Sequence, residues 1–367
     1  MNFNIKRTSL LPCLQCVSGN IERRQSLPIL TNLLFEIKPN SLSVTATDME
    51  VELVVVDTEI KFDNAARFTL PGKKLFDICR SLPDDAVIDF DIQEDKAQIR
   101  SGKSRFTLAT LPAQEYPVID VTDETTDFKL SHKKLTKLLI NTQFAMAQQD
   151  VRYFLNGLML EISPDKIKAV ATDGHRLAYD ETGIQGSAGE SRQIIVPRKG
   201  VTELIRLLQT SQSDADVRIS KNHIHVTSGN HSFTSKLIDG KFPDYQRVIP
   251  ELSETIIVAD RENLKNSLAR AAILSNEKYK GVKISFGENT LKILAHNPEK
   301  EEAKEEVSVN YQGSEMEIGF NVSYLVDALS AINTDKVKLS VLDPNSSCLI
   351  IPEKESLCQY VVMPMKL

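Results

Sequence analysis

The sequence predicts an α+β fold made of three copies of one domain. The first observation is a motif that recurs at a domain-sized period: Ala46–Asp48, Ala171–Asp173 and Ala295–Asn297 each follow an alternating apolar segment, 125 and then 124 positions apart. The second is a helical pattern found in every third of the chain. The third is a series of short strand-like runs between the helices. Because self-similarity at a fixed period marks repeated units, we expect three domains.

Each third opens with a short helix, because two leucines four positions apart lie on one helical face. These pairs are Leu10/Leu14, Leu135/Leu139 and Leu264/Leu268. Ser131 and Asp260 are the expected N-caps of the second and third of these helices. Pro12 is expected early in the first helix, where a proline does least harm.

A later helix recurs in tighter register, with apolar residues at i, i+3, i+4 and i+7 that mark one buried stripe. The three stripes, 126 and then 124 positions apart, are Leu75, Ile78, Cys79 and Leu82; Val201, Leu204, Ile205 and Leu208; and Leu325, Ala328, Leu329 and Ile332. Pro71, Pro197 and Asn321 precede these helices, and the prolines suit a first turn.

Strand-like runs fill the remaining sequence and predict antiparallel sheets with helices packed on one side. The runs are 32–37, 50–56, 86–90 and 105–109; 155–162, 193–196, 217–219 and 232–237; and 282–286, 305–310, 337–341 and 360–363. The predicted domains are 1–122, 128–251 and 254–367.

The composition restricts the class of protein. A net charge of −6 argues against a surface that grips nucleic acid everywhere, although a local basic face remains compatible with it. The sequence shows no signal-peptide pattern and no stretch near the roughly 18 apolar residues of a membrane span, so we expect no membrane association. Five cysteines form no even framework and favour a reducing cytoplasm.

Two motifs resemble reactive sites but favour structural roles. Cys13 and Cys16 have the spacing of a zinc half-site, yet no second pair exists, and packing on an apolar helix is the favoured interpretation. Gly102–Ser104 resembles the end of a phosphate-binding loop, but position 97 is Ala97 and the following residues alternate like a strand.

Asp173 and His175 are the candidates for an enzymatic alternative, as an acid–base pair or with a metal. The first copy has Asp48 without a histidine, and Asn297 replaces the acid in the third. An Asx-type turn, in which the short polar side chain bonds the local backbone, fits all three copies. The sequence therefore favours a protein that is not an enzyme and that has no metal or cofactor.

Charge is distributed unevenly. The segment 299–306 carries five glutamates, whereas Lys74, Lys103 and Arg105 form a basic set in the first third. Unlike patches near opposite ends of the chain fit head-to-tail self-association. Basic residues also recur on the helices and suggest faces turned toward phosphates. They are Lys73 and Arg80; Lys133 and Lys137, with Asn141; Lys199 and Arg206, with Thr202; and Lys265 and Arg270.

Stretches along the whole chain carry a resemblance to one known family. They are 27–33, 76–80, 149–153, 171–177, 195–200, 242–245, 271–278, 319–324 and 360–367. In these residues the chain resembles the β subunit of bacterial DNA polymerase III, the replicative sliding clamp. The resemblance implies three DNA-clamp domains with sheets outside and two helices each inside, forming half of a ring. It further implies a head-to-tail homodimer around double-stranded DNA, without sequence specificity.

The resemblance also implies three sets of site residues. The DNA-facing set is Arg24, Lys73, Arg80, Gln149, Tyr153, Phe154, Lys199 and Tyr279. The subunit-junction set is Lys74, Lys103, Arg105, Phe106, Leu108, Ile273, Leu274, Glu299, Glu301, Glu302 and Glu305. The partner-peptide cleft is Leu155, Thr172, Gly174, His175, Arg176, Leu177, Pro243, Arg247, Val248, Tyr324, Ser347, Val361, Met363, Pro364 and Met365.

The implied partners carry a short peptide, roughly Gln-Leu-x-Leu-Phe, that enters this cleft. They are the polymerase III catalytic subunit, the clamp loader, and other DNA polymerases and repair proteins. The ring would act as a tether that catalyses nothing, and the loader would supply ATP hydrolysis. A sequence-specific DNA binder is a second alternative, and it predicts tight binding to short linear duplexes.

Overall fold

The computed structural model describes residues 1–21, 27–120, 126–185, 191–354 and 357–366, which divide into two compact units. The first unit comprises Met1–Thr136 and Lys199–Leu237 with a short piece that begins at Gln185. The second comprises Lys137–Ile184 and Ile238–Leu367 with a short piece that ends at Arg198.

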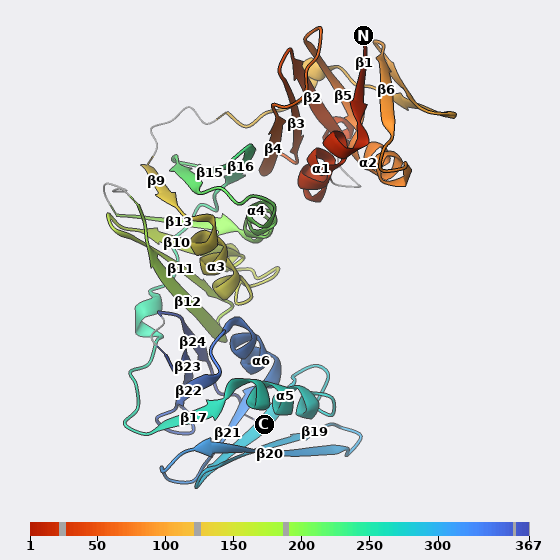
Figure 1. Ribbon diagram of the computed structural model, residues 1–367. Helices are drawn as coiled ribbons and strands as arrows, with labels where there is room; N and C mark the ends of the chain where they lie inside the picture. The colour runs from red at the N-terminus through yellow and green to blue at the C-terminus, as the bar shows by residue number, and fades with distance from the viewer. Residues whose placement is uncertain (22–26, 121–125, 186–190, 355–356, 367) are drawn as a thin grey trace. The chain divides into compact units, whose positions relative to one another are not determined.

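One order of elements occurs three times: a strand, a helix, four strands, a helix and three strands (Figure 1). The first copy is β1 (Asn2–Lys6), α1 (Arg7–Val17), β2 (Asn32–Lys38), β3 (Ser41–Thr47), β4 (Val51–Asp57), β5 (Ala66–Pro71), α2 (Gly72–Ser81), β6 (Val87–Ile92), β7 (Lys96–Ser101) and β8 (Ser104–Ala109). The second is β9 (Thr126–Leu130), α3 (His132–Gln143), β10 (Gly157–Ile162), β11 (Lys166–Thr172), β12 (Arg176–Gly183), β13 (Arg192–Pro197), α4 (Arg198–Thr210), β14 (Ala215–Ile219), β15 (His223–Ser228) and β16 (His231–Lys236). The third is β17 (Ile256–Asp260), α5 (Arg261–Ala272), β18 (Gly281–Gly287), β19 (Thr290–His296), β20 (Glu302–Asn310), β21 (Met316–Asn321), α6 (Val322–Ala331), β22 (Lys336–Ser340), β23 (Cys348–Pro352) and β24 (Gln359–Val362). The predicted threefold repeat is confirmed.

Strand pairing repeats as well. The orders β5-β2-β3-β4, β13-β10-β11-β12 and β21-β18-β19-β20 are equivalent, and so are β1-β6-β7-β8, β9-β14-β15-β16 and β17-β22-β23-β24. Every pairing between these strands is antiparallel, as the sequence predicts. The alternation of buried and exposed residues along β18 illustrates the reason, since one face of a strand meets the core and the other does not.

The sheets continue from one copy into the next. Val51–Val55 of β4 pair with His231–Ser235 of β16, and Arg176–Tyr179 of β12 pair with Gln359–Val362 of β24. Pairing of two edge strands satisfies backbone groups that each copy alone would leave open. The first unit therefore contains an eight-stranded sheet and the second a twelve-stranded one. Residues 121–125, within the first predicted domain boundary, lie outside the described residues.

The helices pack through the predicted stripes. Leu14, Leu75 and Leu325 are at most 2% exposed, and α1 contacts α2 as α5 contacts α6 (Figure 1). The predicted N-cap Asp260 accepts a hydrogen bond through Oδ1 from the backbone N–H of Asn263, at 2.8 Å. Among the described helices, none combines the length and apolar character needed to cross a membrane.

Three local predictions are wrong. Pro12 is the sixth residue of α1, because the helix begins at Arg7 directly after β1. Asn141, predicted to share a phosphate-facing stripe of α3 with Lys133 and Lys137, is only 2% exposed, because it meets the buried Asp180, whose Oδ2 accepts from Asn141 Nδ2 at 2.8 Å. Leu155 belongs to the short 3-10 helix Tyr153–Leu155 that precedes β10 and not to the strand.

Candidate functional site

The repeated Ala-Thr-Asp motif forms the same turn in the first two copies. Asp48 Oδ1 accepts hydrogen bonds from the backbone N–H groups two and three residues later, at 2.9 and 2.7 Å, and Asp173 Oδ1 does the same at 2.9 and 3.0 Å. In the third copy Asn297 Oδ1 accepts from the backbone N–H of Glu301 at 2.9 Å. The interpretation as an Asx-type turn is confirmed, since each side chain bonds the local backbone.

The residue after the aspartate adopts a left-handed conformation. Its φ is 73° at Met49 and 88° at Gly174. A Cβ at Gly174 would lie 2.9 Å from Nη2 of Arg152, whose guanidinium donates to the backbone oxygen of Asp173 at 3.3 Å. Arg152 therefore packs directly on the turn of the second copy.

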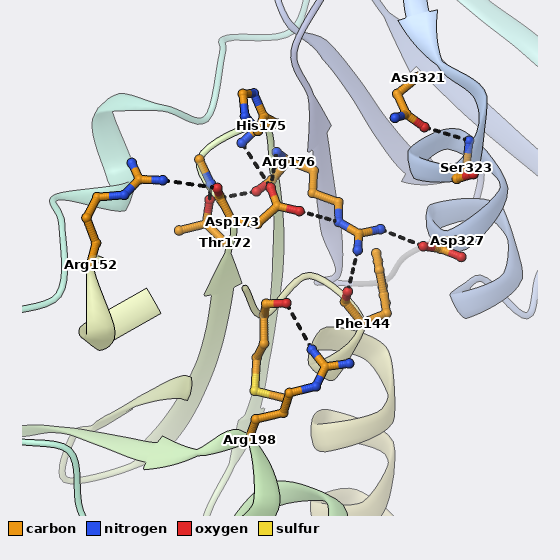
Figure 2. A network of polar contacts seen from close by, with 12 residues as sticks. Phe144, Arg152, Thr172, Asp173, His175, Arg176, Arg198, Asn321, Ser323 and Asp327 are labelled. Atoms are coloured by element: carbon orange, nitrogen blue, oxygen red, sulfur yellow. Dashed lines mark hydrogen bonds and ion pairs between the residues drawn. The ribbon is translucent and has the colours of Figure 1, made fainter. Parts of the chain in front are cut away.

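Arg176, at the end of this turn, has a side chain that is 13% exposed and connects two parts of the second unit (Figure 2). Its Nε donates to Asp173 Oδ2 at 3.0 Å, Nη1 to Asp327 Oδ2 at 2.5 Å, and Nη2 to the backbone oxygen of Phe144 at 2.7 Å. Its guanidinium carbon lies 4.5 Å from the ring centre of Tyr324. Charge-assisted bonds of this kind hold an arginine in one orientation.

These contacts assign Asp173 a structural role. Its Oδ1 accepts from two backbone N–H groups and its Oδ2 accepts from Arg176, while His175 reaches it through the backbone N–H. A general base would need to face a substrate proton, and both oxygens here face the turn. Within the described residues, no group of three or more His, Cys, Asp or Glu side chains could hold a metal ion.

The predicted cleft residues come from several elements of the second unit. Thr172 ends β11; Gly174 and His175 form the turn; Arg176 and Leu177 begin β12; Tyr324 is on α6; Ser347 precedes β23; Val361 is on β24; Met363, Pro364 and Met365 follow it; Leu155, Pro243, Arg247 and Val248 lie in or beside short 3-10 helices. The pairing of β12 with β24 brings residues that are distant in sequence to one place, because Leu177 is opposite Val361.

Part of this set forms one apolar cluster. Leu155, Leu177 and Val361 are at most 2% exposed and pack together, with Val248 against them. Met363, which is 36% exposed, donates its backbone N–H to the oxygen of His175 at 2.9 Å. A buried aliphatic floor with an accessible methionine beside it suits the anchoring of apolar side chains.

Arg247 is placed differently from the rest of the predicted cleft. Its side chain is 86% exposed and forms an ion pair with Asp244 at 2.8 Å. The other guanidinium of the predicted set, Arg176, is instead nearly enclosed by its partners.

Three predicted DNA-facing cations of the first unit, all within the described residues, already have carboxylate partners. Lys73 and Arg80 lie 2.8 and 3.6 Å from Asp77 on the same helix, and Lys199 lies 2.5 Å from Asp48. Lys73 and Arg80 nevertheless keep 47% and 64% of their side chains exposed. Exposed ion pairs contribute little energy, so these two cations remain available to phosphates. Arg24 lies outside the described residues.

Predicted DNA-facing residues in the second unit come from turns and from the short 3-10 helix Tyr153–Leu155. Tyr153 and Tyr279 are 58% and 56% exposed. Phe154 packs edge-on against Tyr153 at 5.8 Å, and Gln149 is exposed with a φ of 57°. This set offers aromatic and amide groups with little charge.

The predicted subunit-junction residues form two sets. Lys103, Arg105, Phe106 and Leu108 lie on or beside β8, the last strand of its sheet, and Lys74 lies on α2. Ile273 and Leu274 follow α5, whereas Glu299, Glu301, Glu302 and Glu305 lie before or on β20. Glu305 accepts two bonds from Arg270 of its own chain, at 2.9 and 2.6 Å, and Glu302 lies 2.7 Å from Lys304, so two of the four acids already have cationic partners.

Cys13 and Cys16 pack in the first unit as predicted. They are 5% and 7% exposed, and burial raises the pKa of Cys13 to about 12 and that of Cys16 to about 11. Gly102–Ser104 leads into β8, which confirms the strand predicted after it.

Three residues that contact the turn or Arg176 were not predicted from the sequence: Asp327, Phe144 and Arg152. Asp327 lies three positions after Tyr324 on α6, so both lie on one helical face. This spacing could have indicated that Asp327 lies beside the predicted cleft residue Tyr324. Phe144 contributes a backbone oxygen, which no side-chain motif reveals.

Comparison with known proteins gives matches along the whole chain. Families described as the N-terminal, central and C-terminal domains of the DNA polymerase III beta subunit match residues 1–120, 129–244 and 246–366. The beta sliding clamps of Pseudomonas aeruginosa and Escherichia coli are 47% and 45% identical to the chain, each over 100% of both sequences. A crystal structure of a sliding clamp from Pseudomonas aeruginosa bound to griselimycin is similar with a TM-score of 0.96, at 47% identity and full coverage of both chains.

Proposed function

The chain belongs to the DNA polymerase III beta subunit family, the DNA sliding clamps, and we propose that two copies join head to tail into a ring around duplex DNA. As a sliding clamp it is a processivity factor and not an enzyme. The ring would bind DNA topologically and without sequence specificity.

Two open sheet edges, one flanked by basic residues and the other by acidic residues, are the main support for this proposal. The outer edge of β8 has no strand beside it among the described residues. On the side of β20 that faces away from β19, β17 pairs only with Val309 and Asn310, so the earlier part of β20 also has an open edge. An open edge is a template for a strand of another chain. Lys103 and Arg105 flank the first edge, and acidic residues before and on β20 flank the second. Pairing the edges of two copies is a heterologous contact, which closes into a ring where the rotation permits.

Apolar residues support the same junction. Ile273 is 75% exposed at the end of α5, and Phe106 and Leu108 lie on β8. Burial of such side chains between copies would supply association energy, while the charges select the partner edge.

The proposed lining uses Arg24, Lys73, Arg80, Gln149, Tyr153, Phe154, Lys199 and Tyr279 toward DNA. Phosphate contacts carry no sequence information, which suits a ring that slides. The net charge of −6 disfavours binding of DNA to the rest of the surface.

The proposed cleft holds partner peptides of the type Gln-Leu-x-Leu-Phe on the cluster of Leu155, Leu177 and Val361. Its users would be the polymerase III catalytic subunit, the clamp loader, other DNA polymerases and repair proteins, acting in the cytoplasm. A docked polymerase would stay at the primer end because tethering raises its effective concentration. The loader would hydrolyse ATP to open the ring.

Retention on DNA tests the tether. The ring is loaded on nicked circular DNA with a bacterial clamp loader and separated from free protein by gel filtration. We expect retention on the circle and release after a restriction cut, because a linear duplex lets the ring slide off. Equal retention on cut and intact circles would contradict the proposal.

A matched pair of variants tests the junction. Ile273→Glu should sediment as a monomer at micromolar concentration, because it buries a charge between the copies. Leu342→Glu, at a residue that is similarly exposed (73%) but outside the proposed junction, should remain a dimer.

A further inference from the structure

Arg176 connects elements that come from different copies of the repeat. The turn at 173–176 belongs to the second copy, whereas Asp327 lies on α6 of the third, 151 positions later. Figure 2 shows the guanidinium between the turn and this helix. All the residues involved lie in the second unit.

Tyr324 and Asp327 present one face of α6 to this guanidinium. They are three positions apart, so their side chains lie on the same side of the helix. Asp327 accepts from Arg176 Nη1 at 2.5 Å while the Tyr324 ring centre lies 4.5 Å from the guanidinium carbon. The guanidinium of Arg176 is rigid and planar, so its bond to Asp327 also sets how it lies over the Tyr324 ring.

The remaining bonds of Arg176 come from the second copy. Asp173 Oδ2 and the backbone oxygen of Phe144 hold Nε and Nη2, at 3.0 and 2.7 Å. Among the described residues, Asp327 supplies the polar contact that Arg176 makes with α6. Its side chain is 44% exposed, whereas that of Asp173 is 17% exposed, so Asp327 is not part of the core.

We propose that Asp327 is a positioning residue of the peptide cleft, which acts through Arg176 to hold the Tyr324 ring in its place beside the turn. This inference rests on the proposed role of the cleft. Without the carboxylate, the guanidinium is held only by the second copy, through Asp173 and the backbone oxygen of Phe144, and the Tyr324 ring loses its fixed neighbour. The Tyr324 side chain must then become ordered when the peptide binds, and the conformational entropy lost in this step lowers the affinity.

Fluorescence anisotropy of a labelled Gln-Leu-Ser-Leu-Phe peptide with the full-length protein tests this proposal. We expect Asp327→Asn to weaken binding about tenfold, the scale of one lost charge-assisted hydrogen bond. Asp327→Glu, which keeps a carboxylate, should restore most of the affinity. Asp335→Asn is the matched control, because Asp335 is exposed on the same repeat and contacts Arg261 through its backbone oxygen.

A double-mutant cycle distinguishes positioning from a general loss of structure. If Asp327 acts through Arg176, Asp327→Asn should add no further loss in an Arg176→Met background. Equal affinity of wild type and Asp327→Asn, or a full additional loss in that background, would overturn the inference. Absence of peptide binding by the wild type would instead contradict the proposed function. If the amide variant does not fold, Asp327→Ser provides a second neutral side chain for the same cycle.

Discussion

Gly174 and Met49 occupy equivalent positions of the repeated turn, and both have positive φ values. Met49 shows that this turn accepts a residue with a side chain. Gly174 differs in its surroundings, because the Arg152 guanidinium occupies the place where a Cβ would point. The absence of a side chain at Gly174 therefore allows Arg152 to pack on the turn.

Gly174→Ala tests this difference. We expect a loss of about 1–2 kcal/mol in the free energy of unfolding from the left-handed conformation, together with displacement of Arg152. Urea denaturation gives the first quantity, and peptide anisotropy reports on the turn. Gly102→Ala is the control, because Gly102 has a φ of 54° but no atom within 4 Å of its added Cβ. A Gly174 variant with unchanged peptide affinity would show that Arg152 adapts without consequence.

Single residues differ in how well the sequence alone predicted them. Leu75 and Leu325 were predicted as core because helical periodicity reports burial directly. Asn141 was not, because its burial depends on Asp180, a residue on a different element. Asp327 was missed for the same reason, since its partner lies 151 positions away. Local patterns reveal a face of an element but not the polar group that meets it.

At the scale of elements, α4 packs against the end of α1 through a polar seam in the first unit. Arg206 Nη2 donates to Ser18 Oγ at 2.7 Å, and Glu203 lies beside Gly19, where an added Cβ would be 2.3 Å from Glu203 Oε2. Glu203 is 8% exposed, and this oxygen lies 3.6 Å from Arg206 Nη1, beyond an ordinary hydrogen bond. The contact between α4 and the end of α1 therefore contains a buried carboxylate whose desolvation cost is only partly offset by Arg206.

Burial raises the pKa of Glu203 above 4.5, although Arg206 and Lys199 act in the opposite direction and Asp48 adds to the rise. The folded state therefore binds this proton more tightly than the unfolded chain does. The resulting stability is present below pH 4.5 and is lost as the pH rises through the folded-state pKa. We expect Glu203→Gln to remove this loss, so that the variant gains stability relative to wild type between pH 4.5 and 8.

Thermal or urea unfolding at several pH values measures the effect. The wild type and Glu203→Gln should have similar stability at the acidic end and diverge toward neutral pH. Glu251→Gln, at an exposed position, should follow the wild type throughout. Parallel curves for wild type and Glu203→Gln would show that Arg206 compensates the carboxylate fully.

Strands were predicted by alternation, but their order was not. The runs that became β18 and β22 were visible because one face of each is apolar. The pairing of β4 with β16 joins residues about 180 positions apart, and the pairing of β12 with β24 does the same. An edge strand exposes backbone groups that any strand could satisfy, so the choice of partner is a property of the assembled chain.

At the scale of the molecule, each sheet draws all its strands from one unit. Each unit therefore has its own hydrogen-bonded framework, and we expect each to unfold cooperatively as a whole. The cysteines can report on this cooperativity, because all five are buried in the folded protein. Cys13, Cys16 and Cys79 lie in the first unit, and Cys348 and Cys358 lie in the second.

Thiol reactivity in increasing urea tests this cooperativity. In the folded protein at pH 8 we expect almost no reaction with a disulfide reagent, because the thiolate is the reactive form and burial raises the pKa of Cys79 and of Cys348 to about 12. A cysteine introduced at the exposed Leu342 should react at once and serves as the positive control. As urea rises, alkylation followed by mass spectrometry should show the three first-unit thiols appearing together and the two second-unit thiols appearing together. Reaction of Cys13 or Cys16 at a urea concentration that leaves Cys79 protected would contradict a single cooperative framework in the first unit.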